Sequence, residues 1–213
     1  MKVLKVLCQG EVLILHPSGA AFWENKKMLL IADVHIGKVS HFRKHGSAVP
    51  QQSVRYNFDQ LNEVVTYFQP HTICFLGDLF HSVLNNEWLL FQNWIHDLQC
   101  RVILIAGNHD IIDESMYKAL GVEVKNELVI GSFFLTHYPE YRDDFFNFSG
   151  HIHPGVELRG LGKQILKVSC FVKKKQQFIF PAFGGFTGKY IIKPSILDEV
   201  YVITPDEVIH MKN

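Results

Sequence analysis

The feature that most constrains the fold is an apolar segment, residues 101–106, that runs directly into Gly107, Asn108, His109 and Asp110. A segment of this length and composition is typical of a central parallel strand that is covered on both faces and ends in a tight loop. In open α/β sheets, the loops at the carboxyl ends of strands carry the ligand-binding groups. Asn108 offers an oxygen, His109 a ring nitrogen, and Asp110 a carboxylate that can orient that ring. A polar turn without any function would fit these residues equally well. A functional interpretation therefore depends on whether similar residues follow other strands of the chain.

Strand-like and helix-like segments alternate in the first half of the chain. Strands are expected at residues 28–31, 72–76 and 101–106, with amphipathic helices over residues 53–68 and 85–99 between them. This alternation implies parallel strands joined by right-handed crossovers. Short strands are expected before it, and mainly short strands and hairpins after Asp110. We therefore predict an α/β fold: a four-layered sandwich of two mixed β-sheets flanked by helices, with residues 1–213 forming a single domain.

Composition excludes several classes of protein. Lys and Arg number 21, as do Asp and Glu, so no overall charge attracts nucleic acid or anionic lipid, although bound metal ions can supply positive charge locally. No apolar run approaches the roughly 18 residues of a membrane-spanning helix, and the N-terminus does not resemble a signal peptide. The cysteines stand apart without a CxxC pair, which argues against a disulfide framework or a thiolate zinc site. We expect a cytoplasmic protein without a membrane partner.

Residues with metal-ligating side chains recur at the ends of other strand-like segments. Taken in chain order, these residues are Asp33 and His35, Asp78, His137, and His151 and His153. Each position has a structural alternative, a solvated turn or, for Asp78, a helix cap. Together with Asn108 and His109, however, they supply nitrogen and oxygen donors from five strand ends and no sulfur. This donor set favours Mn, Fe or Zn, and its many histidines argue against Mg or Ca.

The ordered blocks DVH, GD, GNHD, H and GHIH, spread over residues 33–153, resemble the pattern of the calcineurin-like metallophosphoesterases. The resemblance implies two divalent metal ions, of which we expect Mn²⁺ in preference to Zn²⁺ or Fe. It assigns to the first ion the ligands Asp33, His35, Asp78 and His153. It assigns to the second ion Asp78, as the bridge, with Asn108, His137 and His151. It also implies that His109, oriented by Asp110, lies beside the leaving-group oxygen.

Several longer segments are similar to a narrower group, the bacterial ligase-associated DNA damage response endonucleases. The segments are HPSGAAFW, ADVHIGKVSHFRKHG followed by VP, GDLFHS, GNHD, GHIHP and PAFGGFTG. This similarity implies a Mn-dependent phosphodiesterase or nuclease in DNA repair, encoded with a DNA ligase and a helicase. Many members of the wider family carry Asp and Arg shortly after the GD block, whereas this chain has Phe80, His81 and Ser82. His81 is therefore expected to meet the substrate differently.

Basic residues near these blocks are candidates for substrate binding. Lys38, Arg43, Lys44 and Arg159 can neutralise phosphates along an open groove, although a solvated helix surface explains the first three equally well. A narrow, capped pocket would instead favour small nucleotides or phosphomonoesters as substrates. A third alternative is an inactive scaffold that binds repair partners, but a scaffold has no physical need for a complete ligand set.

Overall fold

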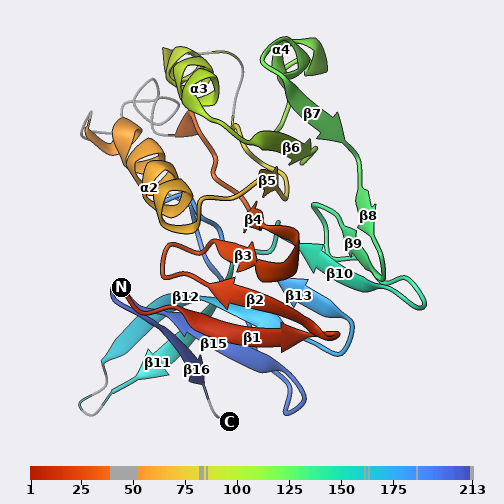
Figure 1. Ribbon diagram of the computed structural model, residues 1–213. Helices are drawn as coiled ribbons and strands as arrows, with labels where there is room; N and C mark the ends of the chain where they lie inside the picture. The colour runs from red at the N-terminus through yellow and green to blue at the C-terminus, as the bar shows by residue number, and fades with distance from the viewer. Residues whose placement is uncertain are drawn as a thin grey trace.

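The computed structural model describes residues 1–38, 52–81, 84, 86–160, 162, 164–185 and 187–211, which form two β-sheets packed face to face (Figure 1). The first sheet has seven strands in sequence order. They are β1 (Leu4–Cys8), β2 (Glu11–Leu15), β3 (Ala21–Trp23), β4 (Met28–Ile31), β5 (Thr72–Phe75), β6 (Arg101–Ile105) and β7 (Val122–Lys125), with the short 3-10 helix η1 (Glu24–Lys26) between β3 and β4. Strands β1 to β4 are antiparallel, and β4 to β7 are parallel.

Helices connect the parallel strands of the first sheet, as the sequence predicts. The helices are α2 (Gln52–Phe68), α3 (Asn86–Asp97) and α4 (Glu114–Ala119). Figure 1 shows them gathered along β4 to β7, away from β12 and β15. Their apolar side chains, such as Leu61, Phe91 and Tyr117, pack with Ile73 and Leu104 of the sheet in one buried cluster. The expected helices and strands of this half are confirmed, with small shifts at their ends.

The second sheet has nine strands and is also mixed. Its strands are β8 (Leu128–Ile130), β9 (Phe133–Leu135), β10 (Phe146–Ser149), β11 (Pro154–Arg159), β12 (Ile165–Lys173), β13 (Gln177–Ile179), β14 (Tyr190–Ile191), β15 (Glu199–Ile203) and β16 (Val208–Met211). A hairpin predicted from residues 161–170 and 177–181 is present as β12 and β13, whereas β11 and β14 were not predicted. Within the described ranges the α-helices all lie on the first sheet, and the outer face of the second carries a small cluster of strand residues such as Val156 and Val202.

The space between the sheets holds the main core. Leu13, Trp23 and Leu30 from the first sheet pack against Phe148 and Phe178 from the second. The Trp23 ring meets the Phe148 ring edge-on, with centroids 5.3 Å apart, a favourable aromatic geometry. Both sheets therefore share one hydrophobic interior.

Parallel strands in each sheet end side by side. In the first sheet, Ile31 pairs with Phe75, and Phe75 pairs with Leu104. In the second, Leu135 of β9 pairs with Phe148 of β10. The loops that follow these strands are therefore neighbours, and they hold the candidate ligands. Across the described ranges, no helix is both long and apolar enough to cross a membrane.

Candidate metal centre and active site

Most of the predicted ligands have an unusual backbone conformation. Nine non-glycine residues of the described chain have positive φ, and five of them are the predicted ligands Asp33 (54°), His35 (52°), Asp78 (51°), His151 (66°) and His153 (50°). The left-handed region costs an L-residue about 1–2 kcal/mol. Strain of this kind persists only where the surrounding structure enforces it, and it concentrates at functional sites.

Glycines in the ligand loops make room for the ligands. A Cβ atom on Gly77 would overlap the ring of His137, and one on Gly107 would overlap the carboxylate and backbone of Asp78. The glycine in each motif is thus required by the close approach of a neighbouring loop.

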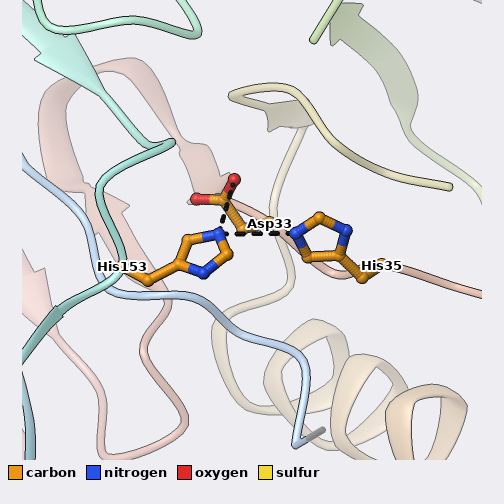
Figure 2. A group of neighbouring side chains, drawn as sticks. All are labelled: Asp33, His35 and His153. Atoms are coloured by element: carbon orange, nitrogen blue, oxygen red, sulfur yellow. Dashed lines mark hydrogen bonds and ion pairs between the residues drawn. The ribbon is translucent and has the colours of Figure 1, made fainter. Parts of the chain in front are cut away.

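Asp33, His35 and His153 bring their donor atoms together in a first cluster (Figure 2). His153 Nε2 lies 3.3 Å from Asp33 Oδ1 and 3.4 Å from His35 Nε2. Asp33 Oδ2 accepts the backbone N–H of His151 at 2.9 Å. Asp33 Oδ1 is buried and accepts no hydrogen bond in the described structure. A buried carboxylate oxygen without a donor, facing two ring nitrogens, fits a bound cation.

Asp78, His137 and His151 form a second cluster. His137 Nδ1 lies 3.0 Å from the carbonyl oxygen of Leu76, which can only accept, so Nδ1 carries the proton and Nε2 of the neutral ring a lone pair. That Nε2 lies 3.1 Å from Asn108 Oδ1 and 3.1 Å from His151 Nδ1. Metal–nitrogen bonds of about 2.0–2.1 Å place neighbouring donors about 3.0–3.4 Å apart, so the donor spacing fits a metal ion.

Asp78 lies between the two clusters and turns one carboxylate oxygen toward each. Oδ2 lies 3.7 Å from His35 Nε2, and Oδ1 lies 3.5 Å from His137 Nε2. Oδ1 also accepts the backbone N–H of His109 at 2.9 Å. The side chain is only 3% exposed. This is the arrangement that a carboxylate shared by two cations requires.

Burial favours the neutral form of two of the candidate ligands, His35 and His151, and so leaves them available to bind a metal ion. Burial lowers the pKa of His35 to about 2, and the positive charge of Lys38 adds to this effect. Burial, followed by the neighbouring His137, lowers the pKa of His151. Neither ring binds a proton near neutral pH, and each presents a lone pair.

Residues 26–192 match the family of calcineurin-like phosphoesterases, and this span contains both clusters. The chain belongs to this family. The phosphoesterase is similar in structure to the nuclease MPE of Pseudomonas putida, with a TM-score of 0.85 and 27% identity over 99% of this chain and 100% of that chain. The expected α/β fold with two mixed sheets is thereby confirmed, and the phosphoesterase is a metal-dependent hydrolase.

A short segment of the phosphoesterase also resembles a curated protein of Pseudoalteromonas sp. (strain SM9913), described as a probable cyclic nucleotide phosphodiesterase. The two are 46% identical over 48 residues. The segment covers 22% of the phosphoesterase and only 18% of the length of that protein.

The predicted leaving-group residue His109 lies beside the first cluster, half-buried. Its ring centroid is 5.3 Å from that of His35 and 4.8 Å from that of His81. The orientation of this ring by Asp110 stays a prediction, because the described hydrogen bonds of the Asp110 carboxylate are to backbone groups. Asp110 Oδ1 accepts the backbone N–H of Phe80 at 3.0 Å, Oδ2 accepts that of Gly107 at 2.9 Å, and no described contact joins the carboxylate to the His109 ring. Asp110 therefore braces two ligand loops of the phosphoesterase.

Of the predicted substrate-binding residues, Lys38 and His81 lie near the candidate metal centre. The backbone N–H of Lys38 donates to the carbonyl oxygen of His35 at 3.2 Å, so Lys38 adjoins the loop of the first cluster. Burial lowers the pKa of Lys38, and the charges of Asp78 and Asp33 oppose that shift. His81 Nδ1 lies 3.3 Å from His35 Nδ1, so His81 also borders the centre. Arg43 and Lys44 lie outside the described residues.

Arg159 is remote from the metal centre of the phosphoesterase. It ends β11, six residues beyond His153, which corresponds to about 20 Å along a strand. Its side chain is 77% exposed, with its guanidinium 3.7 Å from Glu157. A role for Arg159 therefore requires a substrate that extends far from the clusters.

Sequence reasoning missed two buried residues that hold the Asp33–Gly37 loop. Asn57 Nδ2 donates to the carbonyl oxygen of Val34 at 3.0 Å, and Glu87 Oε2 accepts the N–H of Gly37 at 2.8 Å. Each is a polar residue on the buried side of a helix, and that placement was the available signal. Sequence reasoning also missed Tyr138, whose hydroxyl donates to Asn108 Oδ1 at 3.1 Å.

Proposed function

We propose that the chain is a dinuclear-metal-dependent phosphodiesterase that cleaves nucleic acid. The observation that carries this proposal is the position of Asp78, with one carboxylate oxygen toward each donor cluster. Paired ions that share a carboxylate are suited to phosphodiester hydrolysis. The similarity to a nuclease over nearly the whole chain supports nucleic acid as the substrate.

The proposed ligands divide into two sets that share Asp78. The first set is Asp33, His35, Asp78 and His153, and the second is Asp78, Asn108, His137 and His151. When bound, divalent ions supply positive charge to the phosphate oxygens and lower the pKa of a water molecule. Because only Asp33 and Asp78 are negatively charged, two such ions leave the site net positive, as binding of a phosphodiester requires. The donor set of nitrogen and oxygen without sulfur favours Mn, Fe or Zn, and of these we propose Mn²⁺.

We assign to His109 the role of stabilising or protonating the leaving-group oxygen. Its half-buried ring lies next to the first cluster, and its backbone N–H is held by Asp78. A positioned acid of this kind contributes about 10²- to 10⁴-fold to a rate. Lys38 and His81, which border the centre, are proposed to contact the substrate, and Asp110 to support the loop of His109.

The biological setting is proposed from the sequence resemblance alone. It implies DNA repair, together with a DNA ligase and a helicase. We further propose that residues 1–213 act as a single domain, a proposal supported by the core that both sheets share.

A second candidate is hydrolysis of small nucleotides or phosphomonoesters. The short segment shared with a probable cyclic nucleotide phosphodiesterase favours it, although that segment covers 22% of this chain. An inactive repair scaffold is a weaker alternative, because the donor atoms of both clusters converge at metal-binding distances.

The deciding experiment is an activity assay of metal-free protein reloaded with Mn²⁺, Zn²⁺ or Mg²⁺. The substrates are single- and double-stranded DNA, bis-nitrophenyl phosphate, nitrophenyl phosphate and a cyclic nucleotide. We expect Mn²⁺-dependent cleavage of DNA and of the nitrophenyl diester. Hydrolysis restricted to the monoester or the cyclic nucleotide would support the second candidate, and activity without any metal would overturn both.

A further inference from the structure

Tyr138 contacts three of the four donors assigned to the second ion. Its hydroxyl donates to Asn108 Oδ1 at 3.1 Å. Its ring centroid lies 4.3 Å from that of His151 and 4.9 Å from that of His137. The tyrosine therefore lies against the second cluster without supplying a charged group of its own.

The hydroxyl determines which end of the Asn108 side chain faces the cluster. A carboxamide presents an oxygen and an NH₂ group, and only the oxygen has lone pairs for a cation. Asn108 is exposed, so burial alone does not fix the rotation of its amide. A hydroxyl that donates to Oδ1 selects the rotation that also brings this oxygen to His137 Nε2.

Hydrogen bonds from two buried side chains hold the loop that carries Tyr138. Thr136 Oγ1 donates to the carbonyl oxygen of Tyr138 at 2.6 Å, and Asn147 Nδ2 donates to Thr136 Oγ1 at 2.8 Å. Asn147 Oδ1 accepts the N–H of Glu140 at 3.1 Å. Thr136 and Asn147 are both buried, so their hydrogen bonds hold the loop in one conformation.

We propose that Tyr138 is a positioning residue for the second metal ion: its hydroxyl turns Asn108 Oδ1 into the cluster, and its ring fixes the imidazole of His151. This inference rests on the two-ion centre of the proposed function. Groups that orient a metal ligand typically change metal affinity about 10- to 100-fold when they are removed. Within the described part of the chain, the contacts of Tyr138 include none to Asp33, His35 or His153, so Tyr138 acts on the second ion alone.

The test is stepwise Mn²⁺ binding by metal-free protein, followed by calorimetry and by the electron paramagnetic resonance signal of the coupled ion pair. Tyr138→Phe removes only the hydroxyl, and Tyr138→Leu removes the ring as well. Tyr141→Phe is the matched control, since Tyr141 lies in the same loop region and is 70% exposed. We expect the first ion to bind all variants equally. The second should bind Tyr138→Phe about 10- to 100-fold more weakly and Tyr138→Leu more weakly still, with Tyr141→Phe unchanged.

A second readout separates positioning from substrate contact. Excess Mn²⁺ should restore the kcat of Tyr138→Phe on bis-nitrophenyl phosphate, because the variant has a lower affinity for the second ion but keeps every reacting group. Unchanged binding of the second ion in Tyr138→Phe would overturn the inference, as would equal weakening of both ions, or a loss of kcat that metal does not restore. The binding measurement uses no nucleic acid. If the wild type fails to cut DNA but shows the expected metal steps, the proposed substrate is wrong and the role of Tyr138 stands.

Discussion

The backbone N–H of His109 donates a 2.9 Å hydrogen bond to Asp78 Oδ1, the oxygen that also faces His137. The proposed bridge therefore holds the loop of the proposed leaving-group residue as well as the ions. A change at Asp78 can therefore affect both metal binding and the position of the His109 loop. Asp78→Asn separates these two effects, because its amide oxygen can still accept the hydrogen bond from the His109 N–H.

Asp78→Asn should abolish activity and most metal binding, because it removes a negative charge shared by both ions. Metal content by elemental analysis and turnover of bis-nitrophenyl phosphate measure the two effects. Asp97→Asn, at a side chain that is 84% exposed, is the matched control and should behave as wild type. A variant at position 78 that retained two ions and near-normal turnover would show that Asp78 is not the bridge.

His109→Ala should keep both ions but slow DNA cleavage by about 10²- to 10⁴-fold, the usual contribution of a positioned acid. A diester with a nitrophenolate leaving group should be affected much less, since that group departs without protonation. The rates on both substrates, measured beside metal content, test this, with the exposed His96→Ala as control. Equal losses on both substrates with metals retained would contradict the acid role, and loss of metal would make His109 structural or a ligand.

Gly107→Ala should destabilise the metal-free protein by about 1–3 kcal/mol, the usual cost of inserting a methyl group into packed structure. The new Cβ would overlap Asp78, so metal affinity should fall as well. Gly188→Ala is the matched control, because no atom lies within 4 Å of the Cβ position there. Denaturant unfolding and Mn²⁺ titration measure the two effects. Equal stabilities and equal Mn²⁺ affinities of the Gly107→Ala and Gly188→Ala variants would contradict the close approach of Gly107 to Asp78.

His16 should make stability depend on pH. Its burial lowers its pKa from 6.5 to about 4, so between these values the unfolded chain binds a proton that the folded protein does not. The free energy of unfolding should therefore fall as pH decreases from about 6.5 toward 4, by about 3 kcal/mol at most. His16→Asn, which keeps an acceptor for the N–H of Ser18, should remove this part of the dependence. Identical pH profiles of the two metal-free proteins would rule the effect out.

Much of the site was predictable because ligands at the carboxyl ends of parallel strands must meet at one edge. The positions of Asp33, Asp78 and Asn108 follow from this rule and from local patterns of apolar residues. The carboxylate contacts of Asp110 were not predictable, since its partner Phe80 lies 30 residues away and is reached only through the tertiary fold. For the same reason the sequence does not reveal that His137 presents Nε2 and His151 presents Nδ1.

Strand β11 was missed although its residues carry a signal. In its second half Val156 is buried and Leu158 partly buried, whereas Glu157 and Arg159 are exposed, and this alternation is typical of a strand with one covered face. Pro154, the first residue of the strand, and the ligand loop before it obscured this signal, because proline is normally confined to strand ends and edges. Its pairing with β12 and β14 depends on contacts that no local pattern specifies.

The donors come from both halves of the sandwich: Asp33, His35, Asp78 and Asn108 follow strands of the first sheet, and His137, His151 and His153 follow strands of the second. Ions bound there would act as removable cross-links between the sheets, and an unfolded chain could not reproduce such a site. At a free concentration 100 times the Kd, one such ion would stabilise the native state by about 2.7 kcal/mol. The concentration of free metal would then determine the stability of the folded protein as well as its catalytic rate.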